Sequence, residues 1–281
     1  MLEFLWQPAG FDIGETGWWT YDSQQPLWQA FGVGLGNTLR VAVPAVAFAL
    51  VLGASLGLAK LSPLPWWRRL AGAYIHSVRN VPLMVQLMLW YFALVDLLPD
   101  PTAAWSVLPG VWLSKGGLQI PWWDAASGQW SVPAQDTFNV QGGAALTPEF
   151  LALWLALTVY TSAFVAEIVR AGVLSVPRSL LEAAETLGAT PAQVRWRVLW
   201  PQAWQASAPA LVNQVLNLIK NSSLAVAIGY PDLVSVGNTA LNQTGRVIEC
   251  IAIMMLVYLL MSLTVSAVLN RRPAWARGAG P

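Results

Sequence analysis

Charged side chains are scarce in this sequence of 281 residues, at 10%, whereas 56% of the residues are hydrophobic. Soluble globular proteins carry about 25% charged residues, so the deficit excludes an ordinary water-exposed surface over much of the chain. The net charge of +1 is small, and basic residues stand singly or in pairs, which argues against a nucleic-acid partner. Composition therefore places the chain among membrane proteins.

Cysteine and histidine each occur once, as Cys250 and His76. A single cysteine forms no intramolecular disulfide. Cys250 lies in an apolar run, and we expect it to be a small side chain facing lipid or another helix. We expect His76 to be a polar residue at a helix end. The sequence shows no metal-ligand cluster, nucleophile motif or carboxylate pair within a span, so we expect neither an enzyme nor a metal site.

Long apolar runs are what the sequence has instead. A membrane-spanning helix needs about 20 largely apolar residues. Three runs satisfy this almost alone, and two more are apolar but interrupted by polar residues. The sequence thus predicts an all-α fold with about five spans, at Val41–Ala59, Trp66–Leu97, Phe150–Ala166, Ala206–Tyr230 and Cys250–Leu269.

Lysine and arginine are distributed unevenly between the two ends of these spans, and they favour cytoplasmic loops. An external N-terminus leaves only Arg40, Lys115 and Arg246 outside. The same topology puts ten basic residues inside: Lys60, Arg68, Arg69, Arg170, Arg178, Arg195, Arg197, Arg271, Arg272 and Arg277. We therefore expect the N-terminus outside and the C-terminus in the cytoplasm. No lysine or arginine precedes Arg40, so we expect no cleavable signal peptide.

These spans divide the chain into an external N-terminal segment at residues 1–31, a membrane domain at 32–270 and a cytoplasmic tail at 271–281. An external insert at residues 99–148 is rich in Trp, Pro and Gly. Because tryptophan prefers the headgroup level, we expect the insert to lie on the outer membrane surface. A small packed cap over the helices is the alternative. In the first span, Gly53 and Gly57 have the spacing of a close helix contact, and the glycine enrichment that is usual in membrane helices is the alternative.

Between the third and fourth spans, residues 177–203 form a polar loop whose signals predict two short helices. Leu180–Leu187 is a good helix former, and Gly188 is suited to end it in a left-handed conformation. Thr190 can cap a second helix, Pro191–Trp200, with proline at its first position. Pro201 is then expected to break the chain before the next span. Such a protruding element requires a protein groove or the headgroup layer.

This loop resembles the signature loop of ATP-binding-cassette (ABC) importer permeases, which has Glu-Ala-Ala, a glycine and a terminal proline at fixed spacing. The matching positions are Glu182, Ala183, Ala184, Gly188, Val198 and Pro201, with Val198 and Trp200 in place of the usual isoleucine and leucine. The resemblance implies a coupling helix that docks in a cleft of an ATPase subunit. The sequence contains no glycine-rich loop ending in Gly-Lys-Ser or Gly-Lys-Thr. ATP and magnesium are therefore expected in that partner, and no cofactor in this chain.

A wider resemblance, from about Gly10 to Arg272, is to polar-amino-acid permeases, and the Arg79–Pro82 and Lys220–Ser223 tetrads are similar to the general L-amino-acid branch. One departure is Ser179-Leu180, where many relatives have Gly-Gln. The resemblance implies a type I permease fold and alternating access in a bacterial inner membrane. It also implies four kinds of partner: ATPase subunits, an identical or sister permease, a periplasmic solute-binding protein and an amino-acid substrate.

Ionisable and polar residues within spans are candidates for the substrate path, because they are costly there without a function or a partner. Each candidate charge has a structural alternative: Arg79 at the inner headgroups, Glu167 paired with Arg170, and Lys220 bonded to Asn217 or a carbonyl. The candidates are Arg79, Gln86, Glu167, Lys220, Asn221, Ser222 and Ser223. Lys220–Ser223 or the Pro82 kink could supply groups for a zwitterion.

Three other functions are weighed against this hypothesis. A stand-alone secondary transporter would need more spans or an internal repeat, and the sequence shows neither. A membrane enzyme would need a catalytic constellation that is lacking. An ABC permease for another small polar solute remains open.

Overall fold

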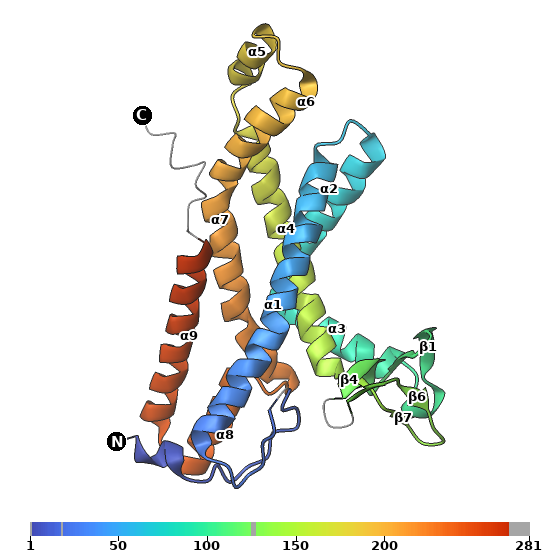
Figure 1. The fold of residues 1–281 in the computed structure, drawn as a ribbon, viewed down its shortest axis with the longest axis vertical. Coiled ribbons are helices and arrows are strands. Elements are labelled where there is room, and N and C mark those ends of the chain that lie inside the picture. The colour runs from blue at the N-terminus through green and yellow to red at the C-terminus, as the bar shows by residue number, and fades with distance from the viewer. Residues whose placement is uncertain (1, 18, 125–127, 270–281) are drawn as a thin grey trace. The chain divides into compact units, whose positions relative to one another are not determined.

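The computed structural model describes residues 2–17, 19–124 and 128–269, and it consists of long helices together with a group of short strands (Figure 1). The expected cytoplasmic tail at 271–281 lies outside the described residues. The α-helices are α1 (Leu27–Lys60), α2 (Pro65–Arg79), α3 (Leu83–Leu97), α4 (Pro148–Leu174), α5 (Arg178–Thr186), α6 (Pro191–Gln193), α7 (Trp200–Asn221), α8 (Leu233–Thr244) and α9 (Val247–Leu269). Shorter turns are η1 (Glu3–Trp6), η2 (Pro101–Ala103), η3 (Val194–Leu199) and η4 (Ser222–Ile228).

Three helices, α1, α4 and α9, are long and apolar enough to cross a membrane. They contain the three uninterrupted runs found in the sequence, so these three predicted spans are confirmed as helices. The interrupted segment Trp66–Leu97 forms α2 and α3 with a short break between them, and Ala206–Tyr230 forms most of α7 followed by η4. A second short break separates η4 from α8, a helix that was not expected from the sequence. Counting each broken pair as one span gives up to five spans in the described part of the chain, and a total of five stays a prediction.

The insert between α3 and α4 is built of strands, so the expectation of an all-α fold is wrong for this segment. The strands are β1 (Trp105–Leu108), β2 (Val111–Ser114), β3 (Gly117–Ile120), β4 (Trp122–Asp124), β5 (Gln129–Ser131), β6 (Ala134–Gln135), β7 (Val140–Gln141) and β8 (Ala144–Leu146). An antiparallel sheet has the order β1-β2-β3-β8, and β4 pairs with β5 and β6 with β7. The physical reason is the alternation of β-branched and aromatic residues with glycine turns, which favours hairpins over a helix.

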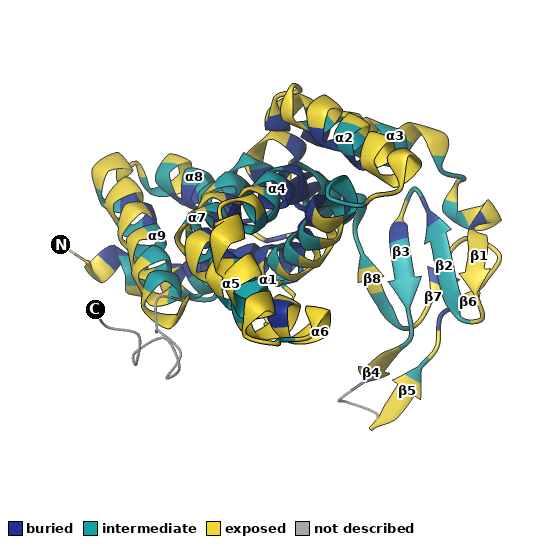
Figure 2. Ribbon diagram, turned by 90° about the horizontal axis from the view of Figure 1, so that it is seen from above, coloured by how far each residue is buried: buried dark blue, intermediate teal, exposed yellow. Residues whose placement is uncertain are grey.

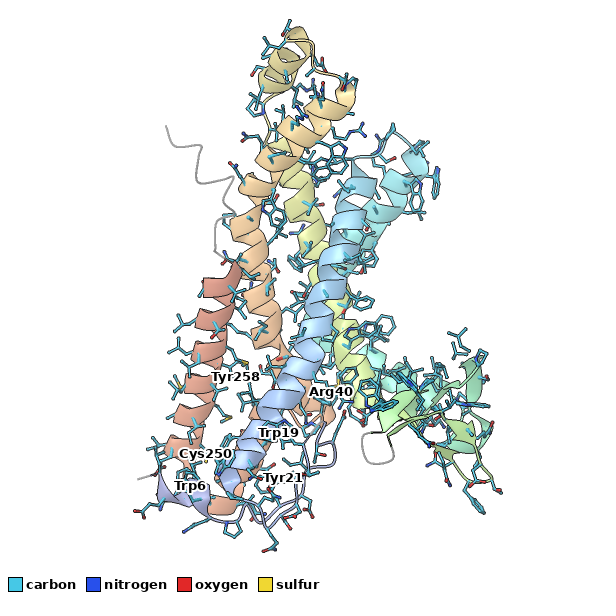
Figure 3. All side chains as sticks on the ribbon, in the orientation of Figure 1. Trp6, Trp19, Tyr21, Arg40, Cys250 and Tyr258 are labelled. Carbon is cyan, nitrogen blue, oxygen red and sulfur yellow. The ribbon has the colours of Figure 1, made fainter. Side chains whose placement is uncertain are left out.

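The chain forms two compact units, each assembled from separate stretches of sequence. The first unit comprises residues 1–41, 82–157 and 222–236, and the second comprises 42–81, 158–221 and 237–281. In the first unit, the N-terminal segment packs on α1. A Cβ atom placed on Gly32 would lie 3.6 Å from the ring of Trp19, which is labelled in Figure 3. The strands of the insert also belong to this unit.

A partly buried ionic cluster ties the N-terminal segment of the first unit to α1 and to the start of α4. Arg40 of α1, labelled in Figure 3, forms an ion pair with Glu15, whose other oxygen accepts a hydrogen bond from Thr147 at 2.8 Å. Asn37 donates to the Glu15 carbonyl at 2.7 Å and to the Pro231 carbonyl at 3.0 Å. Burial raises the pKa of the Glu15 carboxyl above 4.5, although Thr147 and Arg40 act in the opposite direction.

In the second unit, α1 and α4 approach closely at two glycines. A Cβ atom on Gly53 would lie 2.7 Å from the Ser162 carbonyl oxygen, and one on Gly57 would lie 2.6 Å from that of Ala166. No side chain fits at either position, so the close contact expected from their spacing is confirmed. Much of α9 is exposed (Figure 2), but Cys250 is fully buried, so it faces protein as one of the two expected alternatives.

Candidate functional site

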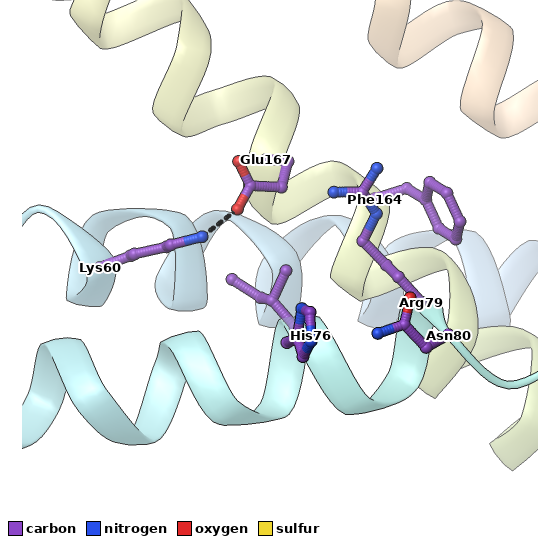
Figure 4. A pocket seen from close by; sticks show the side chains of 7 residues that line it. Lys60, His76, Arg79, Asn80, Phe164 and Glu167 are labelled. Carbon is purple, nitrogen blue, oxygen red and sulfur yellow. Dashed lines mark hydrogen bonds and ion pairs between the residues drawn. The ribbon is translucent and has the colours of Figure 1, made fainter.

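A polar cavity of about 310 Å³ lies within the second unit, where α1 and α2 end and α4 passes (Figure 4). Pockets for small ligands begin at about 300 Å³, so this one suits a small polar molecule. Its lining includes two of the expected path residues, Arg79 and Glu167. The lining residues are Lys60, Ile75, His76, Arg79, Asn80, Phe164 and Glu167.

Glu167 of α4 stands between two cations. One carboxylate oxygen pairs with Lys60, the last residue of α1, and the other accepts a hydrogen bond from Arg170 Nε at 2.8 Å (Figure 4 draws the Lys60 contact). The structural alternative for Glu167, a pair with Arg170, is therefore confirmed. Lys60 was expected among the loop charges, and its role here could not be anticipated because it lies 107 positions away in the sequence.

Arg79 contributes a further positive charge to the cavity wall. Its guanidinium carbon lies 5.0 Å from the centre of the Phe164 ring, a distance typical of a cation–π contact. Among the described residues, Arg79 forms no ion pair with a carboxylate. His76 lies in the last turn of α2, as expected, and it is exposed towards the cavity with Asn80. The side chains near this cavity thus carry more positive than negative charge.

Lys220 and Asn221 end α7 in the second unit, outside the residues that line the cavity. Lys220 is exposed, as are Asn213 and Asn217. Spacings of four and three residues put these three polar side chains on one face of α7. The opposite face is buried, through residues such as Leu211 and Leu218. This face of α7 is thus a second polar surface in this unit.

The remaining expected path residues belong to the first unit. Gln86 is buried in α3, where it is 6% exposed. Ser222 and Ser223 begin η4, so the Lys220–Ser223 tetrad spans the change from α-helix to 3₁₀-helix. The structure therefore brings Arg79 and Glu167 together and does not gather all seven expected residues in one cavity. Their roles in transport stay predictions.

The loop at 177–203 contains the two expected helical pieces. α5 ends at Thr186 and is capped by Leu187, and the next residue, Gly188, has φ +84°, in the left-handed region expected for this glycine. Gly188 N–H donates to the Glu185 carbonyl at 2.9 Å, and Ala189 N–H donates to that of Ala184 at 3.1 Å. These two bonds form a Schellman motif, which satisfies carbonyls at the end of the helix. Glu182 and Ala183 lie exposed on α5.

The second helical piece begins as expected but ends differently. Thr190 and Gln193 form a reciprocal capping box, with Pro191 at the first position of α6. A break at Pro201 is wrong, because the helix continues through the π-helical turn η3 into α7, and Pro201 is the second residue of α7. The turn closes by a bond from Trp200 N–H to the Arg195 carbonyl, so the wider winding accommodates the missing N–H of proline.

This elbow, defined as residues 178–199, exposes large apolar side chains. No residue of α5 is buried, and Leu187 is 89% exposed. Trp196, which lies in η3, is 69% exposed. Sequence reasoning selected the Glu-Ala-Ala positions and Val198, which is half-buried, but it missed Leu187 and Trp196. Apolar residues in an otherwise polar loop were the available signal.

A protein with membrane-length apolar helices, a polar cavity and a capped helical elbow has the features of a transport subunit. The chain belongs to the family of binding-protein-dependent transport system inner membrane components, whose model matches residues 48–272. This result confirms the predicted class of protein, and it agrees with a multi-pass inner-membrane location. Members of this family are transport subunits and are not themselves catalytic.

Several named relatives have similar sequences over most of their length. The putative amino-acid ABC transporter permease protein YhdX of Escherichia coli is 39% identical, over 95% of this chain and 83% of the relative. The general L-amino acid transport system permease protein AapQ of Rhizobium johnstonii is 34% identical, over 95% and 81%. These names agree with the resemblance found in the sequence.

Solved structures show the same fold. A chain in the crystal structure of an amino acid ABC transporter with histidines matches with a TM-score of 0.63 and 28% identity, covering 86% of this chain and 92% of that chain. A chain of the MetNI methionine ABC transporter in an inward-facing conformation matches with a TM-score of 0.57 at 19% identity, which supports the fold alone. The type I permease fold is thus supported for most of the chain.

Proposed function

We propose that this chain is the permease subunit of an ATP-driven importer and conducts amino acids across the inner membrane by alternating access. The cavity beside Arg79 and Glu167 is the observation that carries the substrate class. An amino acid is a zwitterion that needs a cation for its carboxylate and an acceptor for its ammonium group. Arg79 offers the first, and the Glu167 carboxylate and Asn80 amide oxygen offer the second. The names of YhdX and AapQ support the same class.

The charge arrangement favours binding of the substrate carboxylate at Arg79. Glu167 already neutralises part of the charge of Lys60 and Arg170, whereas Arg79 has only a ring contact among the described residues. A guanidinium binds a carboxylate through two parallel hydrogen bonds, which fixes both its position and its orientation. Arg79 would therefore hold the part that all amino acids share, and the rest of the cavity would contact the variable side chain.

We place the energy source in a partner. The sequence lacks the phosphate-binding loop of an ATPase, so ATP and magnesium would be bound by separate ATPase subunits. The elbow would dock in a groove of that subunit through Leu187 and Trp196, whose exposed apolar surface requires such a contact. A second permease, identical or related, would complete the pathway, and a periplasmic solute-binding protein would deliver the substrate to the side where the N-terminus lies.

Uptake in proteoliposomes tests this function. The purified chain alone should hydrolyse no ATP and transport nothing. Co-reconstitution with its ATPase, its partner permease if distinct, and its binding protein should give ATP-dependent uptake of labelled amino acids. A panel of acidic, neutral and basic amino acids, with a sugar and a phosphate as controls, identifies the cargo. Uptake of the controls but of no amino acid would reject the substrate class, and ATP hydrolysis by the isolated chain would reject the division of labour.

Gly188 provides a separate test of coupling through the elbow. Gly188→Val places a β-branched residue at φ +84°, where it is strained by about 1–3 kcal/mol although no neighbour lies within 4 Å of a Cβ atom. We expect this variant to lose ATP-dependent uptake and stimulated ATPase activity while it retains its cavity. Gly188→Asn is the matched control, because asparagine tolerates the left-handed conformation. Normal uptake by Gly188→Val would contradict the coupling role.

A further inference from the structure

The strands of the insert expose several aromatic and aliphatic side chains. On β4 and β5, Trp122, Trp123 and Trp130 are 48%, 49% and 66% exposed. β1 is an edge strand of the larger sheet, and all of its residues are exposed, including Trp105 and Leu108. An exposed apolar edge in water invites aggregation, so this surface requires a covering. Figure 2 shows these strands coloured as exposed.

The register of the β4–β5 hairpin puts tryptophan on both of its faces. Trp123 is directly opposite Trp130, and their rings pack edge to face with centroids 6.0 Å apart. Trp122 is opposite Ser131, and because successive side chains alternate, it points to the other face. A protein partner lying against one face would leave the other face in water. Immersion in an amphipathic layer covers both faces at once.

Chain connectivity holds one end of the insert next to the start of an apolar helix. β8 ends at Leu146, and α4, which is long and apolar enough to span a membrane, begins at Pro148. Only Thr147 lies between them, and its hydroxyl oxygen accepts a hydrogen bond from Phe150 N–H at 3.1 Å, which caps the helix. One residue extends at most about 3.6 Å, so the end of β8 lies close to the end of the span.

Charge decides which lipid surface the insert fits. Residues 99–148 contain one lysine, Lys115, and three aspartates, Asp100, Asp124 and Asp136, so their net charge is −2. Lys115 also pairs with Asp100 at 3.1 Å, which leaves no basic cluster for anionic headgroups. Tryptophan instead partitions to the headgroup level through its own amphipathic ring, without requiring lipid charge.

We propose that the insert is an interfacial anchor, in which the β4–β5 hairpin and β1 immerse their tryptophans among zwitterionic headgroups of the leaflet where α4 begins. Lipid is the occupant of this surface, and it contacts both faces of the hairpin. This role is independent of the substrate and of ATP coupling, so it holds or fails separately from the transport function.

Site-directed fluorescence quenching in lipid nanodiscs tests the anchor with the full chain. In a Cys250→Ala background, single cysteines replace Trp122, Trp130 or Trp105 and carry a bimane label. Glu185→Cys on the exposed elbow is the aqueous control, and Met255→Cys, at a position 68% exposed on α9, is the acyl-chain control. Nitroxides placed on headgroups, at shallow acyl positions or at deep acyl positions report depth, and iodide reports water.

We expect the labels at 122, 130 and 105 to lose fluorescence to headgroup and shallow nitroxides and to resist iodide, while Glu185→Cys shows the reverse. Replacing zwitterionic by anionic lipid should leave this pattern unchanged. Iodide quenching equal to that at Glu185→Cys would overturn the proposal, as would lipid quenching at only one of positions 122 and 130. Protection that appears only when a binding protein is added would also overturn it, because the occupant would then be protein. The label at 105 keeps the test valid if a hairpin substitution disrupts β4 and β5.

Discussion

Two glutamates, Glu15 in the first unit and Glu167 in the second, have similar partners but different surroundings. Each pairs with a basic side chain and accepts a second hydrogen bond. Glu15 is enclosed, with a side chain 12% exposed, and its neighbours are satisfied by one another. Glu167 lines a cavity that also contains Arg79. The same kind of ion pair thus contributes to packing at Glu15 and lines a candidate ligand site at Glu167. The cavity beside Glu167 makes the difference.

Arg79→Gln should have the largest effect on uptake. It removes the positive charge that the cavity beside Glu167 offers to a substrate, and the surroundings of Glu15 offer no such charge. A hydrogen bond to a charged group contributes about 1.5–3 kcal/mol, so we expect the substrate concentration for half-maximal uptake to rise about 10- to 150-fold. The thermal midpoint should hardly change, because Arg79 is exposed. Arg79→Lys, which keeps the charge but not the bidentate geometry, should be intermediate. Unchanged uptake kinetics would remove Arg79 from the binding site.

Glu15→Ala should do the opposite and act on stability alone. It leaves Arg40 without its partner in a largely buried position, and breaking such a pair costs about 3 kcal/mol. We expect a lower melting temperature for the purified protein and normal uptake per folded molecule at a lower temperature. Glu3→Ala, which removes an acid from the exposed N-terminal turn, is the control. Altered substrate preference in Glu15→Ala would mean that the two sites are not distinct in function.

Glu167→Gln should change which amino acids are carried. The carboxamide keeps the shape of the side chain but removes the negative charge between Lys60 and Arg170. One unit charge about 4 Å away in a wet site is worth about 1 kcal/mol, which corresponds to about a fivefold change. We expect uptake of acidic amino acids to rise relative to basic ones by that factor in competition assays. A uniform loss for all substrates would assign Glu167 a structural role like that of Glu15.

The smallest expected effect is on pH dependence, and it concerns the enclosed glutamate. Burial raises the pKa of Glu15 above 4.5, so over the interval just above pH 4.5 the folded protein holds a proton that the unfolded chain has lost. Stability should therefore decrease as pH rises through this interval and become constant above it. Melting temperatures measured across the interval should show this decrease in the wild-type protein and a smaller one in Glu15→Gln. An equal slope in both proteins would contradict the assignment.

Local signals in the sequence were sufficient for three of the spans and for the two helix boundaries at Gly188 and Thr190 in the elbow. Gly188, Thr190 and Pro191 act on their own neighbours, so their conformations followed from residue type. The pairing of Glu167 with Arg170 was available for the same reason, because the two lie on adjacent turns of one helix. The strands of the insert were also indicated by Pro109-Gly110 and Gly116-Gly117 between short apolar stretches, but the tryptophan content directed attention to the membrane surface alone.

Long-range contacts could not be obtained in this way. Lys60 reaches Glu167, and Arg40 reaches Glu15, only because the fold brings distant segments together, and nothing in their local sequence marks the partner. The continuous helix at Pro201 was missed for a different reason. A π-helical turn depends on the wider hydrogen-bond pattern of the backbone, and residue propensities do not encode that pattern well.

The glycines of α1 determine more than the distance between two helices. Gly57 lies one turn before Lys60, and it contacts α4 at Ala166, the residue next to Glu167. A methyl group at Gly57 would force the two backbones apart at the place where the charged pair meets. The lack of a side chain at Gly57 therefore helps to set the width of the polar cavity. Gly57→Ala would widen the cavity beside Lys60 and Glu167 without replacing any residue that lines it.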